Sequence, residues 1–582
     1  MKIPVPRNAF DKDEQAIEAC AASSSNNWAT SFFLFAFLAG IYTAILWTVP
    51  PAGDFPLNDD WVYTKSVCQL LSEGTYRGHP YMLANPILHV YMGALISQIW
   101  GGGFEQLRMW ALVLGLITAW VAAECGKTCG LRFWGCLLIG LVVLLNPINL
   151  NLSYTFMTDG PFVFFSCLSG YFFLRGIRFN TTRSVLAGSF FAGAAYMIRQ
   201  FGVLMVLAYV ATEVCLYLRR RRSFPWQRLF SSLAPASVLF FLTLYLSRHR
   251  EIGTSLPFQL DIISFIPRAG YLFVVSVSYL AFFCIPVVAV VAIERFSAPS
   301  KERHRFLKRS LVTLAAMLPF LFWHGLQRLP TFLPNMIYDF GVGPITMLRE
   351  GDPWQGPIHI GRLWWPVTLV WMAMGAVVML LMFESAWALF TRREEPDAET
   401  PTGLFLVLWA ATIILGLANP WTIGHINIRY IMPALIPVAL LSAHAAPSPI
   451  RKSSICTAIA FTVLLGVLSV VFIQDYFAWQ RARWQAVACL TEELEIPLEQ
   501  ISGGFEVNGW YHSDQFMEIH DTRDFTFRGP YGFYALDDTY IVTLAKARDG
   551  YDHFLDVPYF SWLGMETRHI RVLKRKTLSG SD

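Results

Sequence analysis

Long apolar runs separated by short polar loops occupy most of the chain. A run of about 18 or more apolar residues is long enough to cross the hydrocarbon core of a membrane as a helix. The stretch from Ser184 to Leu218 is too long for one helix, and Arg199 within it predicts a tight turn between two spans. The pattern predicts an all-α polytopic membrane protein with about 13 transmembrane helices, at residues 28–49, 106–125, 131–149, 160–177, 184–199, 201–218, 230–247, 271–293, 309–325, 364–384, 403–418, 429–446 and 455–473.

The apolar segment 85–100 is short and starts with Asn-Pro, so its length alone does not assign it. Cytoplasmic loops are enriched in Lys and Arg, and the basic loops of this chain fall on one side throughout only if 85–100 does not cross the membrane. We therefore expect an interfacial or re-entrant helix in the first outer loop. The N-terminal tail, residues 1–27, is then predicted to be cytoplasmic, and residues 28–473 are predicted to form the transmembrane domain.

Residues 474–582 are more polar than the rest of the chain. They contain a helical start at Trp479–Leu494 and two strand-like runs, at Tyr540–Leu544 and His569–Leu573. The sidedness derived from the basic loops puts this region outside the cytoplasm. It is predicted to form a small α+β domain on the extracytoplasmic face.

Composition agrees with a membrane protein. Hydrophobic residues make up 55% of the chain and charged residues 15%, against roughly 45–50% and 25% in ordinary soluble proteins. The net charge is +4 at pH 7, which is too small for this length to indicate a polybasic surface for nucleic acid. The expected partners therefore include the lipid bilayer and no nucleic acid.

Acidic residues stand where two predicted spans meet outer loops. Asp59 and Asp60 follow the first span, and Asp159 ends the loop before the span at 160–177. Carboxylates at the membrane edge are candidates for chemistry. A carboxylate close to a hydroxyl acts as a general base, and an acidic neighbour raises its pKa or helps hold a divalent cation. The alternatives are a solvated loop or helix N-cap for the acidic pair, and a plain helix cap for Asp159.

Several basic residues are predicted to lie on the same outer face, namely Lys65, Arg77, Arg199 and Arg429, with Tyr430 beside the last. Arginine binds phosphate through two parallel hydrogen bonds, so these residues are candidates for binding a substrate phosphate. A base and a phosphate clamp at a membrane surface suit transfer of a group from a lipid phosphate to a hydroxyl. The alternatives for Arg199 and Arg429 are residues that mark a span end or snorkel to the interface.

The order and sidedness of these motifs resemble the GT-C superfamily of polytopic glycosyltransferases, especially the branch with the protein O-mannosyltransferases and the lipid A aminoarabinose transferase. The resemblance covers about residues 1–475 and is carried by Asp59-Asp60, Thr158-Asp159-Gly160-Pro161 and Arg429-Tyr430. The pair is Asp-Asp where Asp-Glu is common in that family. Ala84-Asn85-Pro86 stands where relatives have the Lys-Pro-Pro that helps hold the lipid phosphate.

The resemblance implies a polyprenyl-phosphate-linked sugar donor and an inverting transfer to a hydroxyl of a lipid, glycan or protein on the extracytoplasmic side. By position, Asp59 is the general base, Asp60 supports it, and Asp159 orients the acceptor. Asp59 and Asp159 are also the expected ligands of a divalent cation, Mg, Mn or Zn, where the reaction uses one. Because Lys-Pro-Pro is missing, Lys65, Arg77, Arg199 or Arg429 has to hold the lipid phosphate.

Two other classes of function stay open at this point. A transporter or flippase of lipid-linked sugars is expected to carry charged residues at mid-span and broken helices near the midplane. A non-catalytic scaffold is expected to tolerate replacement of Asp59. The charged residues of this chain cluster at span ends, which favours the enzyme. We expect a multi-pass protein of the bacterial inner membrane with its C-terminal domain outside the cytoplasm.

Overall fold

The structure is a computed structural model that describes residues 8–82, 84–220, 224–250, 262–323, 364–391, 399–418, 427–447, 449–521 and 529–576. In this part of the chain, eight helices are long and apolar enough to cross a membrane, or nine if the bent pair α5 and α6 counts as one span. The prediction of a helical membrane protein is confirmed, and the number of 13 spans stays a prediction. The loop between the predicted spans 309–325 and 364–384 lies outside the described residues.

The elements of the first half of the chain include the segments that carry the acidic motifs. They are α1 (Asn8–Thr48), α2 (Asp60–Glu73), α3 (Ile87–Trp100), α4 (Phe104–Thr128), α5 (Phe133–Leu144), α6 (Pro147–Ser153), α7 (Asp159–Phe179), α8 (Thr182–Tyr196), the 3₁₀ turn η1 (Gln200–Gly202), α9 (Val203–Arg220), α10 (Trp226–Leu246) and the 3₁₀ turn η2 (Ser247–His249).

The second half holds further apolar helices and then a mixed region with strands. Its elements are α11 (Ile262–Phe283), α12 (Ile285–Phe296), α13 (Ser300–Trp323), α14 (Trp364–Thr391), α15 (Glu399–Gly416), the 3₁₀ helix η6 (Ile428–Ala434), α16 (Leu435–His444), α17 (Lys452–Ala488), the π-helical turn η7 (Cys489–Glu493), the 3₁₀ turn η8 (Leu498–Gln500), β1 (Ile501–Ser502), α18 (Phe505–Ile519), β2 (Tyr540–Thr543), β3 (Tyr551–Ser561) and β4 (Glu566–Arg575).

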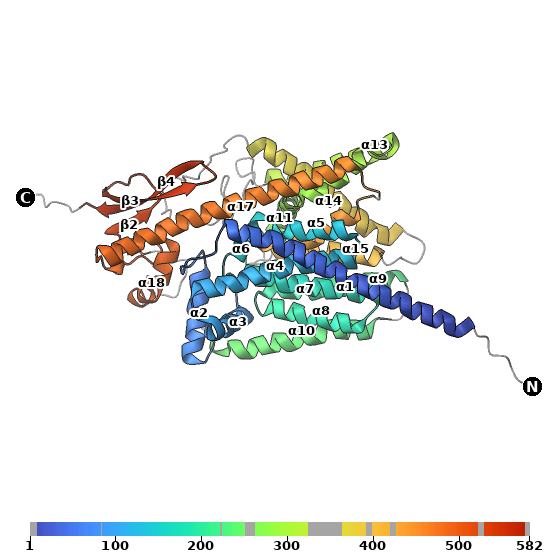
Figure 1. Cartoon of the computed structure of the whole chain (residues 1–582), viewed down its shortest axis with the longest axis horizontal. Helices are drawn as coiled ribbons and strands as arrows, with labels where there is room; N and C mark the ends of the chain where they lie inside the picture. The colour runs from blue at the N-terminus through green and yellow to red at the C-terminus, as the bar shows by residue number, and fades with distance from the viewer. Residues whose placement is uncertain are drawn as a thin grey trace, which may run out of the picture.

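The long helices run side by side along one axis of the molecule (Figure 1). α4 packs against α5 and α7, and α8 packs against both α7 and α10. At one end of this bundle lie the strands, α18, α3 and α2, which runs across the bundle axis, while α1 starts at the opposite end (Figure 1). α17 runs from the bundle to the sheet and crosses residue 474 without a break.

The segment predicted to lie at the membrane surface forms α3. This apolar helix has 14 residues, which gives about 21 Å of rise against about 30 Å of hydrocarbon core. It packs against α2 and α4 at the end of the bundle that also carries the sheet (Figure 1). Its length is below that of a membrane-spanning helix, and its interfacial or re-entrant position stays a prediction.

The span predicted at 131–149 is not one straight helix. It consists of α5 and α6, which meet at an angle of 64°. Pro147 has no backbone N–H to continue the hydrogen bonds of α5. The side-chain oxygen of Asn146 accepts from the backbone N–H groups of Ile148 (2.9 Å) and Asn149 (3.0 Å), which makes it the N-cap of a new helix. The Asn-Pro pair thus redirects the chain towards Thr158-Asp159.

The C-terminal region contains a four-stranded sheet with the strand order β1-β2-β4-β3. β1 and β2 are parallel, and the other neighbours are antiparallel, with Ile541 opposite Leu573. Val542 and Val572 of the sheet belong to a core that Ala486 of α17 completes. The sheet therefore rests on the end of the same helix that crosses the bundle, as the contacts of α17 with β3 and β4 also show.

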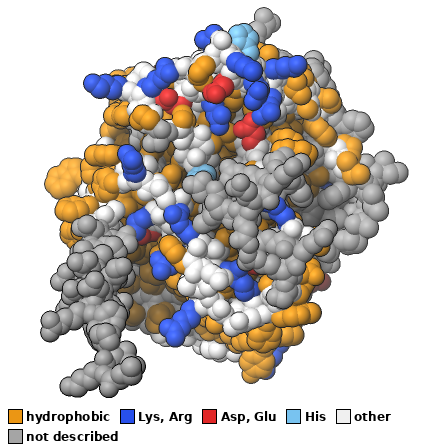
Figure 2. Space-filling model, turned by 90° about the vertical axis from the view of Figure 1, so that its right-hand side faces the viewer, with side chains coloured by type: hydrophobic (Ala, Val, Ile, Leu, Met, Phe, Trp, Pro, Cys, Tyr) orange, Lys and Arg blue, Asp and Glu red, His pale blue; other side chains and the backbone are white. Residues whose placement is uncertain are grey.

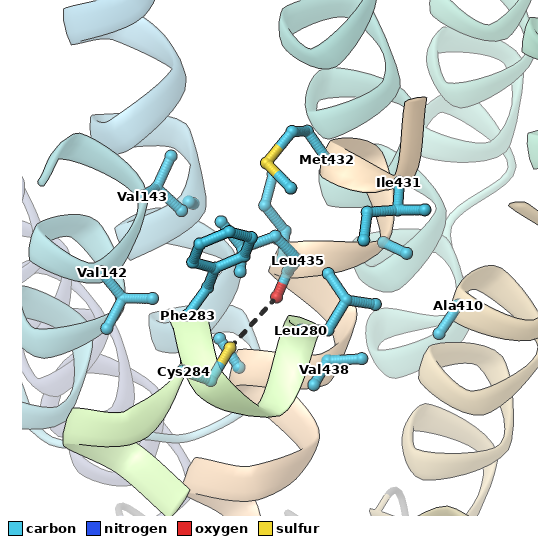
Figure 3. Packing of buried hydrophobic residues seen from close by; sticks show 14 of the residues in the cluster. Val142, Val143, Leu280, Phe283, Cys284, Ala410, Ile431, Met432, Leu435 and Val438 are labelled. Atoms are coloured by element: carbon cyan, nitrogen blue, oxygen red, sulfur yellow. Dashed lines mark hydrogen bonds between the residues drawn. The ribbon is translucent and has the colours of Figure 1, made fainter. Parts of the chain in front are cut away.

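A second apolar core lies inside the bundle, under the segment that follows Arg429 (Figure 3). The thiol of Cys284, which directly follows α11, lies 3.9 Å from the carbonyl oxygen of Leu435, the first residue of α16. Ile431 and Met432 of η6 are fully buried in this core. Their packing holds η6 in place, and with it the side chains at the start of η6.

The end of the bundle at which α1 starts is rich in basic side chains. Figure 2 shows this end, where Lys and Arg side chains outnumber Asp and Glu side chains. Lys127 at the end of α4 and Arg178 at the end of α7 belong to loops predicted to be cytoplasmic. The positive charge of this end is the charge expected for the cytoplasmic side, because cytoplasmic loops are enriched in Lys and Arg.

Candidate active site

The carboxylate of Asp59 points into the protein rather than capping its own helix. Asp59 is the N-cap residue of α2 and makes no side-chain capping hydrogen bond. Its Oδ2 accepts a hydrogen bond from Nη2 of Arg429 over 3.1 Å. The preceding residue, Asn58, has φ 56°, in the left-handed region that asparagine tolerates. The plain-cap alternative therefore does not account for the position of the Asp59 side chain.

Asp159 joins a second ion pair next to the first. Its Oδ2 accepts from Nη2 of Arg199 over 2.8 Å, and its Oδ1 lies 3.7 Å from Nε of Arg429. Arg199 also donates to Oγ1 of Thr158, from Nε over 3.0 Å and from Nη2 over 2.9 Å. Asp159 is the first residue of α7, where a negative charge is favoured by the helix dipole. It therefore starts a helix and also binds two arginines.

The ring of Tyr430 lies beside both arginines. The guanidinium carbon of Arg199 is 4.8 Å from the ring centroid, and that of Arg429 is 5.4 Å away. Both distances are within the range of cation–π attraction. Tyr430 thus helps to hold two like charges close together, which the carboxylates of Asp59 and Asp159 also favour.

The two carboxylates differ in their access to solvent. The side chain of Asp59 is 15% exposed and that of Asp159 is 2% exposed. Burial raises the pKa of Asp59, and the charge of Arg429 offsets part of that rise. A carboxylate with a raised pKa that still reaches solvent is a stronger base than an ordinary one. Of the two carboxylates, Asp59 is the more exposed one.

Asp60 has a different environment although it is the next residue. Its side chain is buried, and its Oδ2 accepts from the backbone N–H of Leu57 over 3.2 Å. Burial raises the pKa of Asp60 to about 8, although the charge of Arg108 acts in the other direction. Asp60 makes no ion pair with Arg429 or Arg199 in the described part of the chain. It stabilises the turn that carries Asp59.

Lys65 and Arg77 are not brought to this cluster. Lys65 donates to Asp514 over 2.6 Å and to Ser513 over 2.8 Å, both on α18. Nε of Arg77 lies 3.1 Å from a carboxylate oxygen of Glu73 one turn away on α2, with both side chains exposed. Lys65 follows Asp59 by six residues, which turns it by about 240° around the helix axis. A role for either residue in binding the donor therefore stays a prediction.

A divalent cation does not fit the cluster as the described residues form it. Asp59 and Asp159 are each held by a guanidinium group, whose positive charge opposes a cation. Within the described ranges, no group of three His, Cys, Asp or Glu side chains is placed to hold a metal ion. Arg429 contacts both carboxylates, at the place where a shared cation would bind.

Glu506 of the C-terminal region contacts the loop that carries Asn58 and Asp59, called the acidic loop below. The sequence analysis did not predict this contact. Its Oε1 accepts from the backbone N–H of Asn58 over 3.1 Å, and its Oε2 accepts from Nη1 of Arg483 over 2.7 Å. Glu506 and Arg483 are fully buried. A buried Glu is costly unless it is paired. No sequence signal connects residues 506 and 58, because they meet only when α18 packs on the acidic loop.

The side chains of two further arginines donate hydrogen bonds to backbone carbonyl oxygens of the first outer loop. Arg108 of α4 is fully buried and donates to the carbonyl oxygens of Pro51 (2.6 Å), Gly53 (2.8 Å) and Phe55 (2.8 Å). Arg250 donates to the carbonyl oxygens of Met82 (2.6 Å) and Ala84 (2.9 Å). Arg250 thus brings a positive charge to the segment that contains Ala84. The remaining outer loop residues 419–426 lie outside the described part of the chain.

Part of the chain matches a known protein family. Residues 84–247 match the family model described as dolichyl-phosphate-mannose-protein mannosyltransferase. This match confirms the resemblance to the GT-C superfamily of membrane glycosyltransferases that the motifs predict. The matched region includes Asp159 and Arg199 and covers less than half of the chain. No curated protein sequence matches the chain.

Several solved structures are similar to this chain at low identity. The yeast (S. cerevisiae) protein O-mannosyltransferase Pmt1-Pmt2 complex bound to the sugar donor is 18% identical, with a TM-score of 0.32, over 38% of this chain and 34% of that one. The oligosaccharyltransferase of Archaeoglobus fulgidus is 12% identical, with a TM-score of 0.44, over 79% and 58%. ArnT from Cupriavidus metallidurans bound to undecaprenyl phosphate is 14% identical, with a TM-score of 0.38, over 80% and 72%. This chain thus spans 34% of the length of the yeast protein and 58% of the length of the Archaeoglobus fulgidus protein.

The hydrogen bond from the backbone N–H of Asn58 to Glu506 is expected to hold the acidic loop in its folded position. Two double variants differ only in the hydrogen-bond acceptor at position 506: Arg483→Met with Glu506→Gln, and Arg483→Met with Glu506→Leu. Both remove the buried charges together, so neither leaves an unpaired ion. Hydrogen exchange of the peptide around Asn58, followed by mass spectrometry, should be roughly tenfold faster in the Leu variant. Equal exchange in the two variants would mean that Glu506 does not hold the loop.

The raised pKa of Asp60 predicts a pH dependence of stability. Between about pH 4 and pH 8 the folded state keeps a proton on Asp60 that the unfolded state has lost, so stability falls as the pH rises. The slope is at most about 1.4 kcal/mol per pH unit and disappears above pH 8. Asp60→Asn keeps the acceptor for Leu57 and does not titrate. The melting temperature of this variant, relative to that of the wild type, should therefore rise from pH 5 to pH 8. A difference between the two melting temperatures that does not change with pH would contradict the raised pKa of Asp60.

Proposed function

We propose that this protein is an integral membrane glycosyltransferase that moves a sugar from a polyprenyl-phosphate-linked donor to a hydroxyl of a lipid, glycan or protein acceptor. The observation that carries this proposal is the partly exposed carboxylate of Asp59, held by Arg429 beside the pair Asp159–Arg199. The match of residues 84–247 to a mannosyltransferase family supports the same class. A carboxylate base beside two arginines suits a reaction between a hydroxyl and a phosphate-linked sugar.

In the proposed reaction, Asp59 takes the proton of the acceptor hydroxyl. The hydroxyl oxygen forms a bond to the anomeric carbon of the sugar as the bond from that carbon to the phosphate oxygen breaks. The electron pair of the broken bond stays on the lipid phosphate, which leaves as an anion. One displacement of this kind inverts the configuration at the anomeric carbon. Asp159 positions Arg429 and Arg199 and does not itself move a proton.

Arg429 and Arg199 are the groups proposed to stabilise the leaving phosphate. Both are less than a tenth exposed, and a charge in such a water-poor site interacts more strongly than in bulk water. Nε of Arg429 is a buried donor with no hydrogen bond in the described part of the chain. A phosphate oxygen would accept from it. Arg250 is a third basic group and donates to the carbonyl oxygens of Met82 and Ala84, in the loop between α2 and α3.

The proposed reaction takes place on the extracytoplasmic side of a bacterial inner membrane. Asp59, Asp159, Arg199 and Arg429 all lie at starts of helices or in turns rather than inside the long spans. The contact between Asn58 and Glu506 places them at the end of the bundle that carries the C-terminal region. This location favours an enzyme that works at the membrane surface over a flippase, whose charged residues would line the middle of the membrane.

Removal of the base gives the direct test. Purified wild type and Asp59→Asn are compared for transfer of radiolabelled sugar from a set of polyprenyl-phosphate sugars. Loss of a general base should lower kcat by roughly 10²- to 10⁴-fold. Asp552→Asn, an exposed aspartate of β3, is the matched control and should keep full activity. Wild-type transfer should also decline as the pH falls through the raised pKa of Asp59. Transfer that survives Asp59→Asn would refute the base assignment, and no transfer from any donor would favour the flippase.

Chelation tests the divalent cation expected from the family resemblance. Because arginines already neutralise Asp59 and Asp159, EDTA should leave the transfer rate unchanged. A loss that Mg²⁺, Mn²⁺ or Zn²⁺ restores would show that residues beyond the described ranges complete a metal site at these two carboxylates. Arg429→Ala measured in parallel should raise the KM for the donor in the presence and the absence of EDTA.

A further inference from the structure

A pocket of about 800 Å³ lies between the first outer loop and the C-terminal region. It is separate from the cluster of Asp59 and Arg429. One wall is a face of α2, the second is a face of α18, and the loop between α2 and α3 forms the floor. The lining residues are Lys65, Ser66, Cys68, Gln69, Gly78, His79, Pro80, Asp514, Met517, Glu518 and Asp521.

The buried ring of His79 lines this pocket and has an unused hydrogen-bond donor. Its side chain is 5% exposed, and Nδ1 accepts from the backbone N–H of Tyr81 over 3.2 Å. With Nδ1 as acceptor, Nε2 carries the proton of the neutral ring. This Nε2 has no hydrogen-bond partner in the described part of the chain, and the nearest carboxylate oxygen, on Asp514, is 3.9 Å away. Burial and the nearby Lys65 lower the pKa of His79 to about 3, so the ring stays neutral.

The charges around the pocket disfavour an anionic ligand. Asp514, Glu518 and Asp521 are exposed at its rim and oppose an anion such as phosphate. The ammonium group of Lys65 is only 15% exposed and is paired with Asp514 over 2.6 Å. Donors and acceptors alternate over a short distance, from the Lys65 ammonium to the Asp514 carboxylate and the His79 Nε2–H. A polyhydroxyl group both donates and accepts at every oxygen, and it matches this mixture.

We propose that the pocket between α2 and α18 binds an uncharged carbohydrate, with Nε2–H of His79 donating to a sugar oxygen. The proposal rests on the proposed function and deepens it, because it makes the acceptor of the transfer a glycan. Lys65 follows Asp59 by about 9 Å along α2 and faces α18, while Asp59 faces Arg429. The pocket therefore holds a sugar of the acceptor that is remote from the reacting hydroxyl.

Cys68 provides a direct readout of this site. Its thiol is exposed and lines the pocket. The full-length protein in detergent is treated with iodoacetamide, and the alkylation rate of the Cys68 peptide is followed by mass spectrometry with and without sugars. The probes are glucose, galactose, mannose, N-acetylglucosamine, cellobiose and maltotriose, with inorganic phosphate as the anion. Cys456 on α17 is also exposed and serves as the internal control.

At least one sugar should slow alkylation of Cys68 and leave Cys456 unaffected, and phosphate should not protect. His79→Asn keeps a side-chain acceptor for Tyr81 and loses the donor at Nε2. In this variant the sugar concentration for half protection should rise about threefold to tenfold, the effect of one neutral hydrogen bond. A melting temperature equal to that of the wild type confirms that His79→Asn is folded. Asp552→Asn, on β3 and outside the pocket, should leave protection unchanged.

The assay separates this inference from the proposed function, because protection needs no donor and no transfer. Asp59→Asn should lose transfer and keep protection of Cys68. Transfer without protection by any sugar would overturn the carbohydrate site and leave the glycosyltransferase standing. Protection without transfer from any donor would overturn the proposed reaction and leave the carbohydrate site. Protection by phosphate, or protection unchanged in His79→Asn, would overturn the ligand class or the role of His79.

Discussion

The guanidinium group of Arg429 bridges two carboxylates at one end of the helix bundle, Asp59 at 3.1 Å and Asp159 at 3.7 Å, and the rest of the site depends on this contact. Charges that leave water have to be paired. Arg199 completes the balance by pairing with Asp159. These four residues come from the starts of α2, α7 and η6 and from the turn before α9, so pairing them brings distant parts of the chain to one point.

Neighbouring acids acquire different tasks from this arrangement. Asp59 faces Arg429 and retains access to solvent, whereas Asp60 is buried and accepts from the backbone of its own turn. The pKa of both groups is raised by burial, but only Asp59 is placed to meet an incoming hydroxyl. Environment, rather than residue type, thus separates a proposed base from a residue that shapes the loop.

The C-terminal region reaches the same site through two helices. α17 crosses the bundle and carries Arg483, which pairs with Glu506 of α18, and Glu506 in turn accepts from the backbone of Asn58 beside the proposed base. α18 also forms one wall of the pocket that contains His79. The packing of α18 on α2 includes the ring of Trp61 against Gly509 and the contacts of Lys65 with Ser513 and Asp514. This packing positions the acidic loop and shapes the proposed acceptor subsite.

The sequence by itself determined the helical membrane class, the broken course of the chain at Arg199, and the acids and arginine at span ends, because run length and charge position are local properties that hydropathy reads directly. It also pointed to Asp59, Asp159 and Arg429, which the structure brings together. Only the tertiary structure decided that Lys65 turns to α18 and that Glu506 supports the acidic loop. Those contacts join residues up to hundreds of positions apart, and they depend on how helices pack, which no local pattern of the sequence encodes.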